Sequence, residues 1–134
     1  MPKTQELAEA VLTLAKKSWI EVSQETADLT ESEYLSLDYL AHNPHATVGD
    51  VHKQIKVLPA QMSRIVRNLE SEGLVKCEIN PDDKRKINLL ITPAGRRSYQ
   101  KFHDAKLKPL LVALDRLTSD ERTHFMNLAN KMMG

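Results

Sequence analysis

One edge of a predicted helix in the middle of this sequence carries side chains of the types that read DNA. The helix begins at Pro59 and stops before Gly73, and apolar residues recur along one edge at helical spacing. Away from that edge lie Gln61, Ser63, Arg64, Arg67 and Asn68. Arg can pair with guanine through two hydrogen bonds, Gln or Asn can do the same with adenine, and Ser suits phosphate. This pattern favours recognition of a charged polymer over catalysis, with an ordinary solvated helix face as the alternative.

A two-stranded hairpin is predicted to follow this helix. Val75, Cys77 and Ile79 alternate with charged residues, as expected of a half-buried strand. The segment Asn80-Pro81-Asp82-Asp83 has turn chemistry, and the chain returns as a second strand over residues 87–91. Cys77 is the only cysteine, so an internal disulfide is excluded. We interpret Cys77 as a small, half-buried strand residue in preference to a redox sensor.

Charged residues at the tip of this hairpin form the second candidate site. Arg85 is predicted to enter the minor groove, because narrow A·T-rich tracts attract Arg. Lys84 and Lys86 would add phosphate contacts. Asp83 is expected to orient Arg85 or to stabilise the tip rather than to contact DNA, since phosphate repels a carboxylate. The alternative is that these charged residues only keep an exposed turn soluble and bind no DNA.

The charge distribution points to the same part of the chain. The net charge is +1 over 134 residues, but residues 1–52 carry three Lys and Arg against nine Asp and Glu. Residues 53–101 carry eleven Lys and Arg against five Asp and Glu, and residues 102–134 carry five Lys and Arg against four Asp and Glu. A polyanion would therefore be met by the middle third, where Lys and Arg can displace counterions from phosphates. Further candidate phosphate contacts near this region are Thr47, Lys53 and Lys56.

Several more helices must position these two groups. A first helix with a wide apolar surface is predicted from Thr4 to Asp28. Thr30 with Glu33 forms the capping box of a second helix, which Asn43-Pro44 ends. Thr47 caps a short third helix, which leads through a turn into the DNA-reading helix.

Two further helices are predicted after the hairpin. Thr92 caps the first of them with Pro93 at its first position, and Pro109 is expected to kink or divide it. The last helix starts at Thr118 or Ser119. The element order predicts a mainly α (α+β) fold, a winged helix-turn-helix with long N- and C-terminal dimerisation helices.

The long terminal helices predict a homodimer. Nothing inside one small domain is large enough to bury the apolar faces of both. A two-fold dimer would also set two reading helices about one DNA turn (~34 Å) apart on a pseudo-palindromic site. Residues 1–28 and 93–134 are expected to form a helical dimerisation region, and residues 29–92 the winged helix-turn-helix lobe that binds DNA, within one structural domain.

Composition and motifs argue against other classes. No apolar run approaches membrane-spanning length and no signal-peptide pattern is present, so a cytoplasmic protein is expected. Without a Gly-rich phosphate loop, a His-Glu metal motif or a nucleophile motif, we expect neither an enzyme nor a cofactor. Trp19 is expected in the core or the dimer interface in preference to an effector pocket. Surface or packing roles, in preference to a zinc site, are expected of His42, His45, His52, His103 and His124.

Several segments of the chain resemble the MarR family of bacterial transcriptional regulators over nearly its whole length. They are Leu29-Thr30-Glu31-Ser32-Glu33-Tyr34, the run from Met62 to Glu70 with Gly73-Leu74-Val75, the Asp83-Lys84-Arg85 wing motif, Leu90-Ile91-Thr92-Pro93-Ala94-Gly95, and Leu117-Thr118-Ser119-Asp120-Glu121. In this order, the set is specific. The resemblance implies a homodimer joined through its terminal helices that binds promoter DNA. It also implies repression that a small anionic or phenolic ligand relieves.

Three positions depart from the family pattern. The family often has Gly and then Ser in the turn before the recognition helix, where this chain has Lys56 and Leu58. Losing the Ser removes a helix N-cap. His52 stands where the family commonly has a small residue, so packing there is expected to differ.

Two other functions remain open on the sequence alone. One is a protein-interaction winged helix without DNA binding, which would be favoured if Arg64, Arg67 and Arg85 could be replaced without changing DNA affinity. The other is a DNA-binding regulator without a small-molecule effector, which shares the fold and differs only in regulation.

Overall fold

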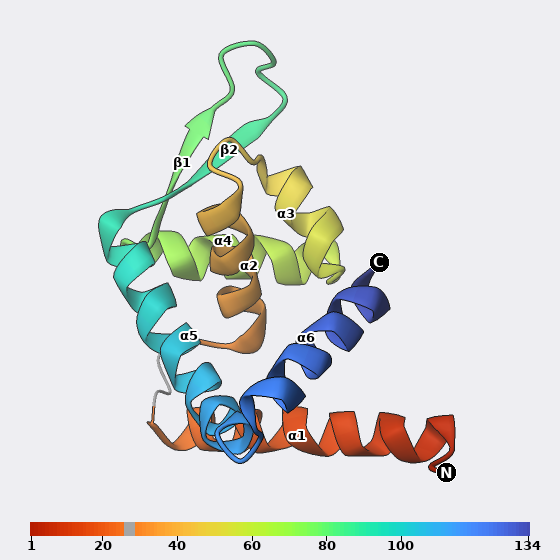
Figure 1. The fold of residues 1–134 in the computed structure, drawn as a ribbon. Helices are drawn as coiled ribbons and strands as arrows, with labels where there is room; N and C mark the ends of the chain where they lie inside the picture. Colours follow the sequence, from red (N-terminus) through yellow and green to blue (C-terminus); the bar gives the residue numbers. More distant parts are fainter. Residues whose placement is uncertain (26–28) are drawn as a thin grey trace. The chain divides into compact units, whose positions relative to one another are not determined.

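The structure is a computed structural model that describes residues 1–25 and 29–134. Its elements, shown in Figure 1, are α1 (Thr4–Glu25), α2 (Glu31–His42), α3 (Val48–Ile55), α4 (Pro59–Ser71), β1 (Val75–Ile79), β2 (Ile87–Ile91), α5 (Pro93–Leu114) and α6 (Ser119–Met133). The predicted order of helices and strands is therefore confirmed, and with it the mainly helical winged fold. The end predicted for the first helix, Asp28, lies outside the described residues.

Two compact units make up the chain. The first combines Met1–Glu25 with Asp104–Gly134, and the second takes in the described residues of Thr26–His103. Helices α2, α3 and α4, both strands and the first part of α5 therefore build the second unit. None of the described helices combines the length and apolar character needed to cross a membrane.

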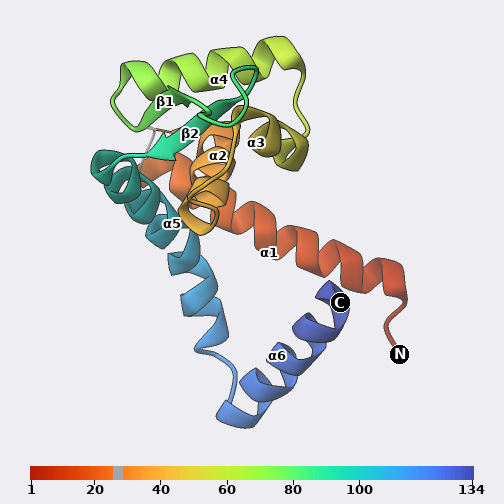
Figure 2. The same ribbon diagram turned by 90° about the horizontal axis from the view of Figure 1, so that it is seen from above.

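The core of the second unit lies where three helices meet the hairpin. Each helix buries one edge there, with Leu37 and Leu40 from α2, Val51 from α3 and Leu69 from α4. Leu89 of β2 closes the core from the sheet, and each of these five residues is at most 1% exposed. Burying one such side chain is worth roughly 1.5–3 kcal/mol, so this packing decides which edge of α4 stays outside. Helix α4 also contacts β1, as Figure 2 shows.

Threonine caps start three of the helices, as predicted. At α2, Thr30 Oγ1 accepts a hydrogen bond from the backbone N–H of Glu33 at 3.2 Å, and Glu33 Oε1 accepts one from the N–H of Thr30 at 2.9 Å. The same reciprocal pairs form at α3 and α6, by Thr47 with Asp50 and by Thr118 with Glu121. These bonds satisfy N–H groups that have no partner inside the helix.

The passage from α4 to α5 closes tightly around the ends of the two strands. Gly73 has φ +73°, a left-handed conformation that ends α4. Thr92 then reaches back, its backbone N–H donating to Leu74 O at 3.0 Å and its hydroxyl to Gly73 O at 2.6 Å. The same hydroxyl accepts from the N–H of Gly95 at 3.0 Å, which caps α5 as predicted. At Gly95 an added Cβ would lie 2.1 Å from Leu74 O, so only glycine fits.

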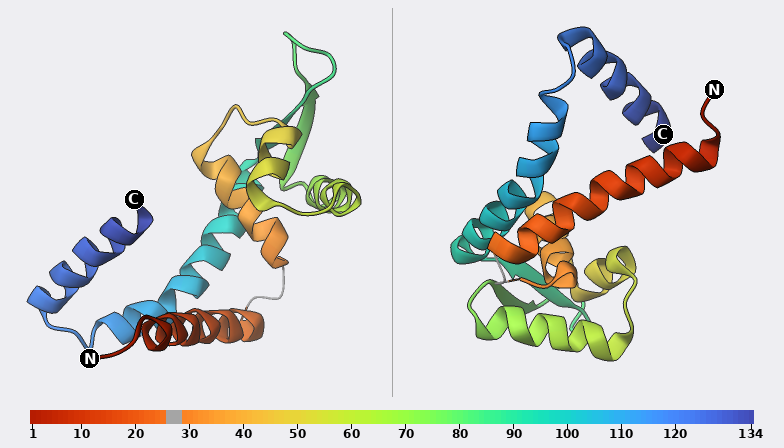
Figure 3. Two further views of the ribbon diagram at one scale, coloured as in Figure 1. Left: turned by 90° about the vertical axis from the view of Figure 1, so that its right-hand side faces the viewer. Right: turned by 90° about the horizontal axis from the view of Figure 1, so that it is seen from below.

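The hairpin extends beyond the helices that cover it. Its strands pair antiparallel, with these facing positions: Val75 and Ile91, Cys77 and Leu89, Ile79 and Ile87. Val75 is buried and Cys77 half-buried, as predicted, but Ile79 is 69% exposed. The prediction of a half-buried Ile79 is therefore wrong, because the wing runs past the helices that cover Leu89. The turned view in Figure 3 also shows it projecting.

In the first unit, α1 is joined to the last part of α5. The hydroxyl of Ser18 donates to Lys106 O at 2.6 Å, and Lys106 Nζ lies 3.4 Å from the centroid of the Trp19 ring. Helix α5 continues past Pro109 to Leu114, so the proline does not divide it.

Large apolar side chains remain exposed on the helices of this first unit. They are Leu7, Val11, Leu12, Leu14 and Ile20 on α1, Leu107, Leu111 and Val112 on α5, and Phe125, Met126, Leu128, Met132 and Met133 on α6. Such a concentration of exposed apolar surface marks an interaction site on a soluble protein.

Candidate nucleic-acid interface

Helix α4 keeps its predicted polar edge outside. Met62, Ile65 and Leu69 are at most 5% exposed and hold the opposite edge against the core. The five candidate DNA-facing residues are all exposed, namely Gln61, Ser63, Arg64, Arg67 and Asn68. The structure gives none of their side chains a hydrogen bond or ion pair with another described residue. Glu70, which could have paired with Arg67, instead accepts from the backbone N–H of Cys77 at 3.2 Å. The polar edge is therefore available to a ligand.

The turn before α4 contains Lys56 and Leu58, two of the residues that depart from the family pattern. Lys56 lies in the left-handed region, with φ 53° and ψ 46°, a conformation that costs roughly 1–2 kcal/mol for a residue with a Cβ. The ring of His52 reaches this turn, its Nε2 donating to Val57 O at 2.6 Å. Helix α4 then begins at Pro59, and Leu58 at its N-cap provides no side-chain hydrogen bond.

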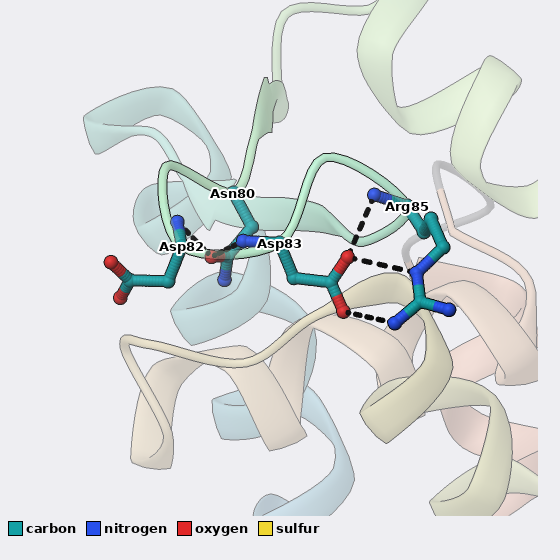
Figure 4. Close-up of polar contacts among 4 residues, drawn as sticks. All are labelled: Asn80, Asp82, Asp83 and Arg85. Carbon is teal, nitrogen blue, oxygen red and sulfur yellow. Dashed lines mark hydrogen bonds and ion pairs between the residues drawn. The ribbon is translucent and has the colours of Figure 1, made fainter.

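At the wing tip, one asparagine organises the turn and one aspartate holds Arg85, as Figure 4 shows. Asn80 Oδ1 accepts from the backbone N–H groups of Asp82 at 2.9 Å and of Asp83 at 3.1 Å. Asp83 Oδ1 accepts from the backbone N–H of Arg85 at 3.0 Å and from its Nε at 3.1 Å. Asp83 Oδ2 accepts from Nη2 of the same guanidinium at 3.3 Å.

Electrostatics at this tip follow from the pair. The hydrogen bond from the Arg85 side chain, followed by that from the Arg85 backbone, lowers the pKa of Asp83 below its ordinary value. The Asp83 carboxylate is therefore ionised at neutral pH and can form the hydrogen-bonded ion pair with the Arg85 guanidinium. Asp83 is 27% exposed at its side chain, whereas Arg85 is 90% exposed. The arginine is thus held from one side and open to solvent on the other.

Four candidate contacts come together in a groove between the start of α3 and the wing. The groove has a volume of about 390 Å³ and is lined by Thr47, Val48, Gly49, Asp50, Lys53, Arg85, Lys86 and Ile87. Backbone pairing holds the two sides together, since Thr47 bridges to Asn88 and the N–H of Leu89 donates to Ala46 O at 3.0 Å. Lys84 and Lys56 are exposed but do not line this groove.

Asp50 is a member of this groove that the sequence interpretation did not single out. Its carboxylate completes the capping box with Thr47, and the Thr47 backbone hydrogen bond is the main cause of a lowered pKa. The positive charges of Lys53 and Lys86 act in the same direction. The Thr-x-x-Asp spacing was the signal that could have identified it. Because Asp50 offsets part of the lysine charge, the groove is less cationic than its lysines suggest.

A second cluster, also missed from the sequence, joins α2 to the first part of α5. Tyr34 Oη lies 2.8 Å from His103 Nδ1, and the Tyr99 hydroxyl donates to Asp38 Oδ1 at 2.6 Å. The rings of Tyr34 and Phe102 are 5.1 Å apart. Burial, followed by the charge of Asp38, raises the pKa of Tyr34 to about 12, and burial also raises the pKa of Tyr99. The spacing of Tyr99, Phe102 and His103 along one helix edge was the available signal.

The remaining reactive side chains have local roles. His42 Nδ1 donates to Asp38 O at 2.8 Å, and in the described part of the chain no three His, Cys, Asp or Glu residues gather as a metal site would require. Burial, followed by a hydrogen bond to Glu70, raises the pKa of Cys77 to about 11, which leaves it a poor nucleophile.

The model of the MarR family matches residues 29–87 of this chain. An uncharacterized HTH-type transcriptional regulator of Bacillus subtilis (strain 168), YwhA, is 22% identical over 86 residues, which are 64% of this chain and 62% of that protein. The chain spans about three-fifths of the length of the first curated relatives that it matches.

Two solved structures are similar over almost the whole chain. A Cys-to-Ser mutant of MarR from E. coli gives a TM-score of 0.80 at 20% identity and covers 100% of this chain and 98% of its own. The second is BpsR from Bordetella bronchiseptica, whose DNA binding is described as regulated by 6-hydroxynicotinic acid. It gives a TM-score of 0.72 at 19% identity, and the match covers 96% of this chain and 99% of BpsR. At these identities, the likeness establishes the fold.

Proposed function

From the match of residues 29–87 to the MarR family model, we propose that this chain is a MarR-type, sequence-specific DNA-binding transcriptional regulator. The observation that carries the proposal is the exposed edge of α4, where five polar side chains have no partner among the described residues and Arg64 and Arg67 supply two positive charges. Buried Met62, Ile65 and Leu69 on the opposite edge support this orientation. A helix supported in this way can enter the major groove, where arginine and amide side chains distinguish bases.

The wing supplies the second contact in this proposal. Arg85 enters the minor groove while Asp83 orients it, because the carboxylate binds Nε and one Nη and leaves the guanidinium exposed. Lys84 and Lys86 bind phosphates beside it. The remaining proposed phosphate contacts are Thr47, Lys53 and Lys56, all of which lie at the two ends of α3 or on its exposed side.

A homodimer completes the proposal. The exposed apolar side chains of α1, α5 and α6 in the first unit support association of two chains through these helices. Trp19 belongs to the same unit and is 37% exposed, so it is proposed to serve this interface rather than the core. A two-fold dimer would present two copies of α4 to a pseudo-palindromic promoter site.

Regulation is proposed to be repression that a small phenolic or anionic ligand relieves. Support comes from BpsR, a structural neighbour whose DNA binding is regulated by 6-hydroxynicotinic acid. Transcriptional regulators act on DNA without catalysing a reaction, so we propose no enzymatic activity, and a cytoplasmic location follows from the DNA partner. A regulator without an effector would retain every DNA contact and fail to release DNA when phenolic acids are added.

Binding of the purified protein to its own upstream DNA, measured at several salt concentrations, tests the proposal. The affinity for this DNA should exceed that for random duplex and should fall steeply with salt, by a slope of about −0.9 per phosphate contact. Equal affinity for both duplexes at physiological salt would overturn the autoregulated repressor.

Three arginine variants separate this function from protein interaction. Arg64→Ala, Arg67→Ala and Arg85→Ala should each weaken specific binding by about 1–3 kcal/mol if the arginine reads a base, or lower the salt slope by about one if it binds phosphate. Arg116→Ala removes an exposed arginine from the other unit and serves as the matched control. If all three variants bind DNA like the unaltered protein, the protein-interaction alternative is favoured.

A further inference from the structure

Leu58 is an exposed apolar residue at the start of the DNA-reading helix. It is 74% exposed and occupies the N-cap of α4 with φ −66° and ψ 148°. Its carbonyl accepts from the N–H of Met62 at 2.9 Å, but its side chain caps nothing. Ser, Thr, Asp and Asn are the favoured residues at this position, and Leu is among the poorest. The Leu58 side chain therefore contributes neither to the core nor to the capping of the helix.

The backbone that carries Leu58 is held on both sides. Before it, the His52 ring donates to Val57 O at 2.6 Å. After it, Pro59 occupies the first position of α4 and restricts the preceding residue to an extended conformation, which is the conformation observed. The side chain thus projects from an ordered support, and little backbone freedom would be lost when it meets a ligand.

The chemistry of the leucine side chain narrows what it can contact in the proposed complex. The first residues of a reading helix lie nearest the base edges, and here the exposed Gln61 follows Leu58 by one turn. Leucine can neither donate nor accept a hydrogen bond, so it cannot pair with base nitrogens or carbonyl groups. The apolar feature that the major groove offers is the C5-methyl group of thymine. We propose that Leu58 contacts a thymine methyl and thereby contributes to the selectivity of α4, an inference that rests on the proposed function.

Deoxyuridine substitution tests this contact, because it removes only the C5-methyl group and leaves every hydrogen-bonding group of the base. The region of upstream DNA that the protein protects is synthesised as a set of duplexes, each with one thymine replaced by deoxyuridine. For the unaltered protein, at least one replacement should weaken binding by about three- to fivefold, as expected for one buried methyl group. If no replacement weakens binding, the proposal is overturned.

Two variants at the same position assign the effect to Leu58. Leu58→Ser removes the apolar side chain and adds a good N-cap, so the variant is expected to fold at least as well. For this variant the sensitive replacement should change affinity by less than about 1.5-fold. Leu58→Met keeps an apolar side chain and should retain most of the sensitivity. If Leu58→Ser is as sensitive as the unaltered protein, another residue makes the contact and the proposal fails.

Ile79→Ala is the matched control, since Ile79 is a similarly exposed apolar residue on the wing. The thymine methyl lies in the major groove, so this variant should keep the full sensitivity to deoxyuridine. Loss of sensitivity in Ile79→Ala as well as in Leu58→Ser would overturn the assignment to Leu58. Failure of the proposed function and failure of the Leu58 contact give different results. Absence of any specific DNA binding removes the proposed function and this inference together, whereas specific binding without the Leu58 effect removes this inference alone.

Discussion

The Asp83 carboxylate places a negative charge at a surface proposed to approach phosphates. By charge alone it would oppose binding, yet it accepts from Nε and Nη2 of Arg85 and from the Arg85 backbone. An arginine free in solution loses about 1.5–2 kcal/mol of side-chain entropy when it is ordered. In the proposed complex, Asp83 would order Arg85 before DNA binds, and this part of the entropy cost would then not oppose binding. Orientation and repulsion therefore make opposite predictions for removal of the charge.

Asp83→Asn distinguishes the two effects. If orientation is the larger, this variant should bind upstream DNA about three- to tenfold more weakly, although it carries one negative charge fewer. Asp82→Asn is the matched control, because Asp82 is a neighbouring exposed carboxylate whose backbone N–H bonds to Asn80. The control should bind as tightly as the unaltered protein or slightly more tightly. Tighter binding by Asp83→Asn in a titration would contradict the orienting role.

Tyr34 gives a pH-dependent prediction. Its pKa is raised from 10.0 to about 12, by burial first and then by the charges of Asp38 and Glu31. The protonated hydroxyl is favoured in the folded state, so its contribution is fully present below pH 10 and is lost as the pH rises towards 12. Urea unfolding between pH 8 and pH 12 should therefore show a smaller alkaline loss of unfolding free energy for Tyr34→Phe. Tyr39→Phe is the control, and equal losses in both variants would refute the assignment.

Among the elements, the junction between α4, the strands and α5 is the most constrained by backbone contacts. Thr92 bonds to both Gly73 and Leu74, and Gly95 in the first turn of α5 lies against the Leu74 carbonyl. This junction holds the first turn of α5 against the ends of α4 and the two strands. The Tyr34 and Tyr99 contacts then hold the first part of α5 against α2. The wing and α5 are therefore attached to the same few residues.

Gly95→Ala should disrupt this junction. The added Cβ would lie 2.1 Å from Leu74 O, and the nearby backbone cannot yield as a flexible side chain could. We expect a loss of more than about 3 kcal/mol in unfolding free energy, measured by urea denaturation. Gly49→Ala in α3 is the matched control, because its Cβ would make only an ordinary 3.7 Å contact with Thr47 Oγ1. That variant should be unchanged or up to about 1 kcal/mol more stable, since Ala favours helices. A Gly95→Ala protein of ordinary stability would show that the junction is not tight.

For the whole molecule, the proposed dimer explains why the first unit exposes so many apolar side chains. We expect the full chain, of 15.2 kDa, to sediment at twice that mass at micromolar concentration. Leu128→Asp on α6 should shift the mass towards the monomer, because it places a charge in the proposed interface. It should also weaken DNA binding, since two half-sites are then read separately. Ile79→Asp, on the wing, is the control and should leave the mass unchanged. A monomer for the unaltered chain would refute the dimer.

Local signals determined much of this protein from the sequence by itself. The caps at Thr30, Thr47 and Thr118 and the exposed edge of α4 were all predictable, because capping spacing and helical periodicity depend on residues within one or two turns. The family resemblance added the wing motif and its proposed partner. None of this required knowledge of which distant segments meet.

Only the tertiary structure decided which residues become buried between distant segments and which of them interact. Ile79 follows the alternation of a half-buried strand and is nevertheless exposed, because burial depends on where α2, α3 and α4 end rather than on the strand itself. Asp50 interacts electrostatically with Lys86, and Tyr34 Oη lies 2.8 Å from His103 Nδ1, across 36 and 69 positions of the chain. Contacts of this kind arise from the packing of whole elements, and no periodicity or spacing within one element specifies them.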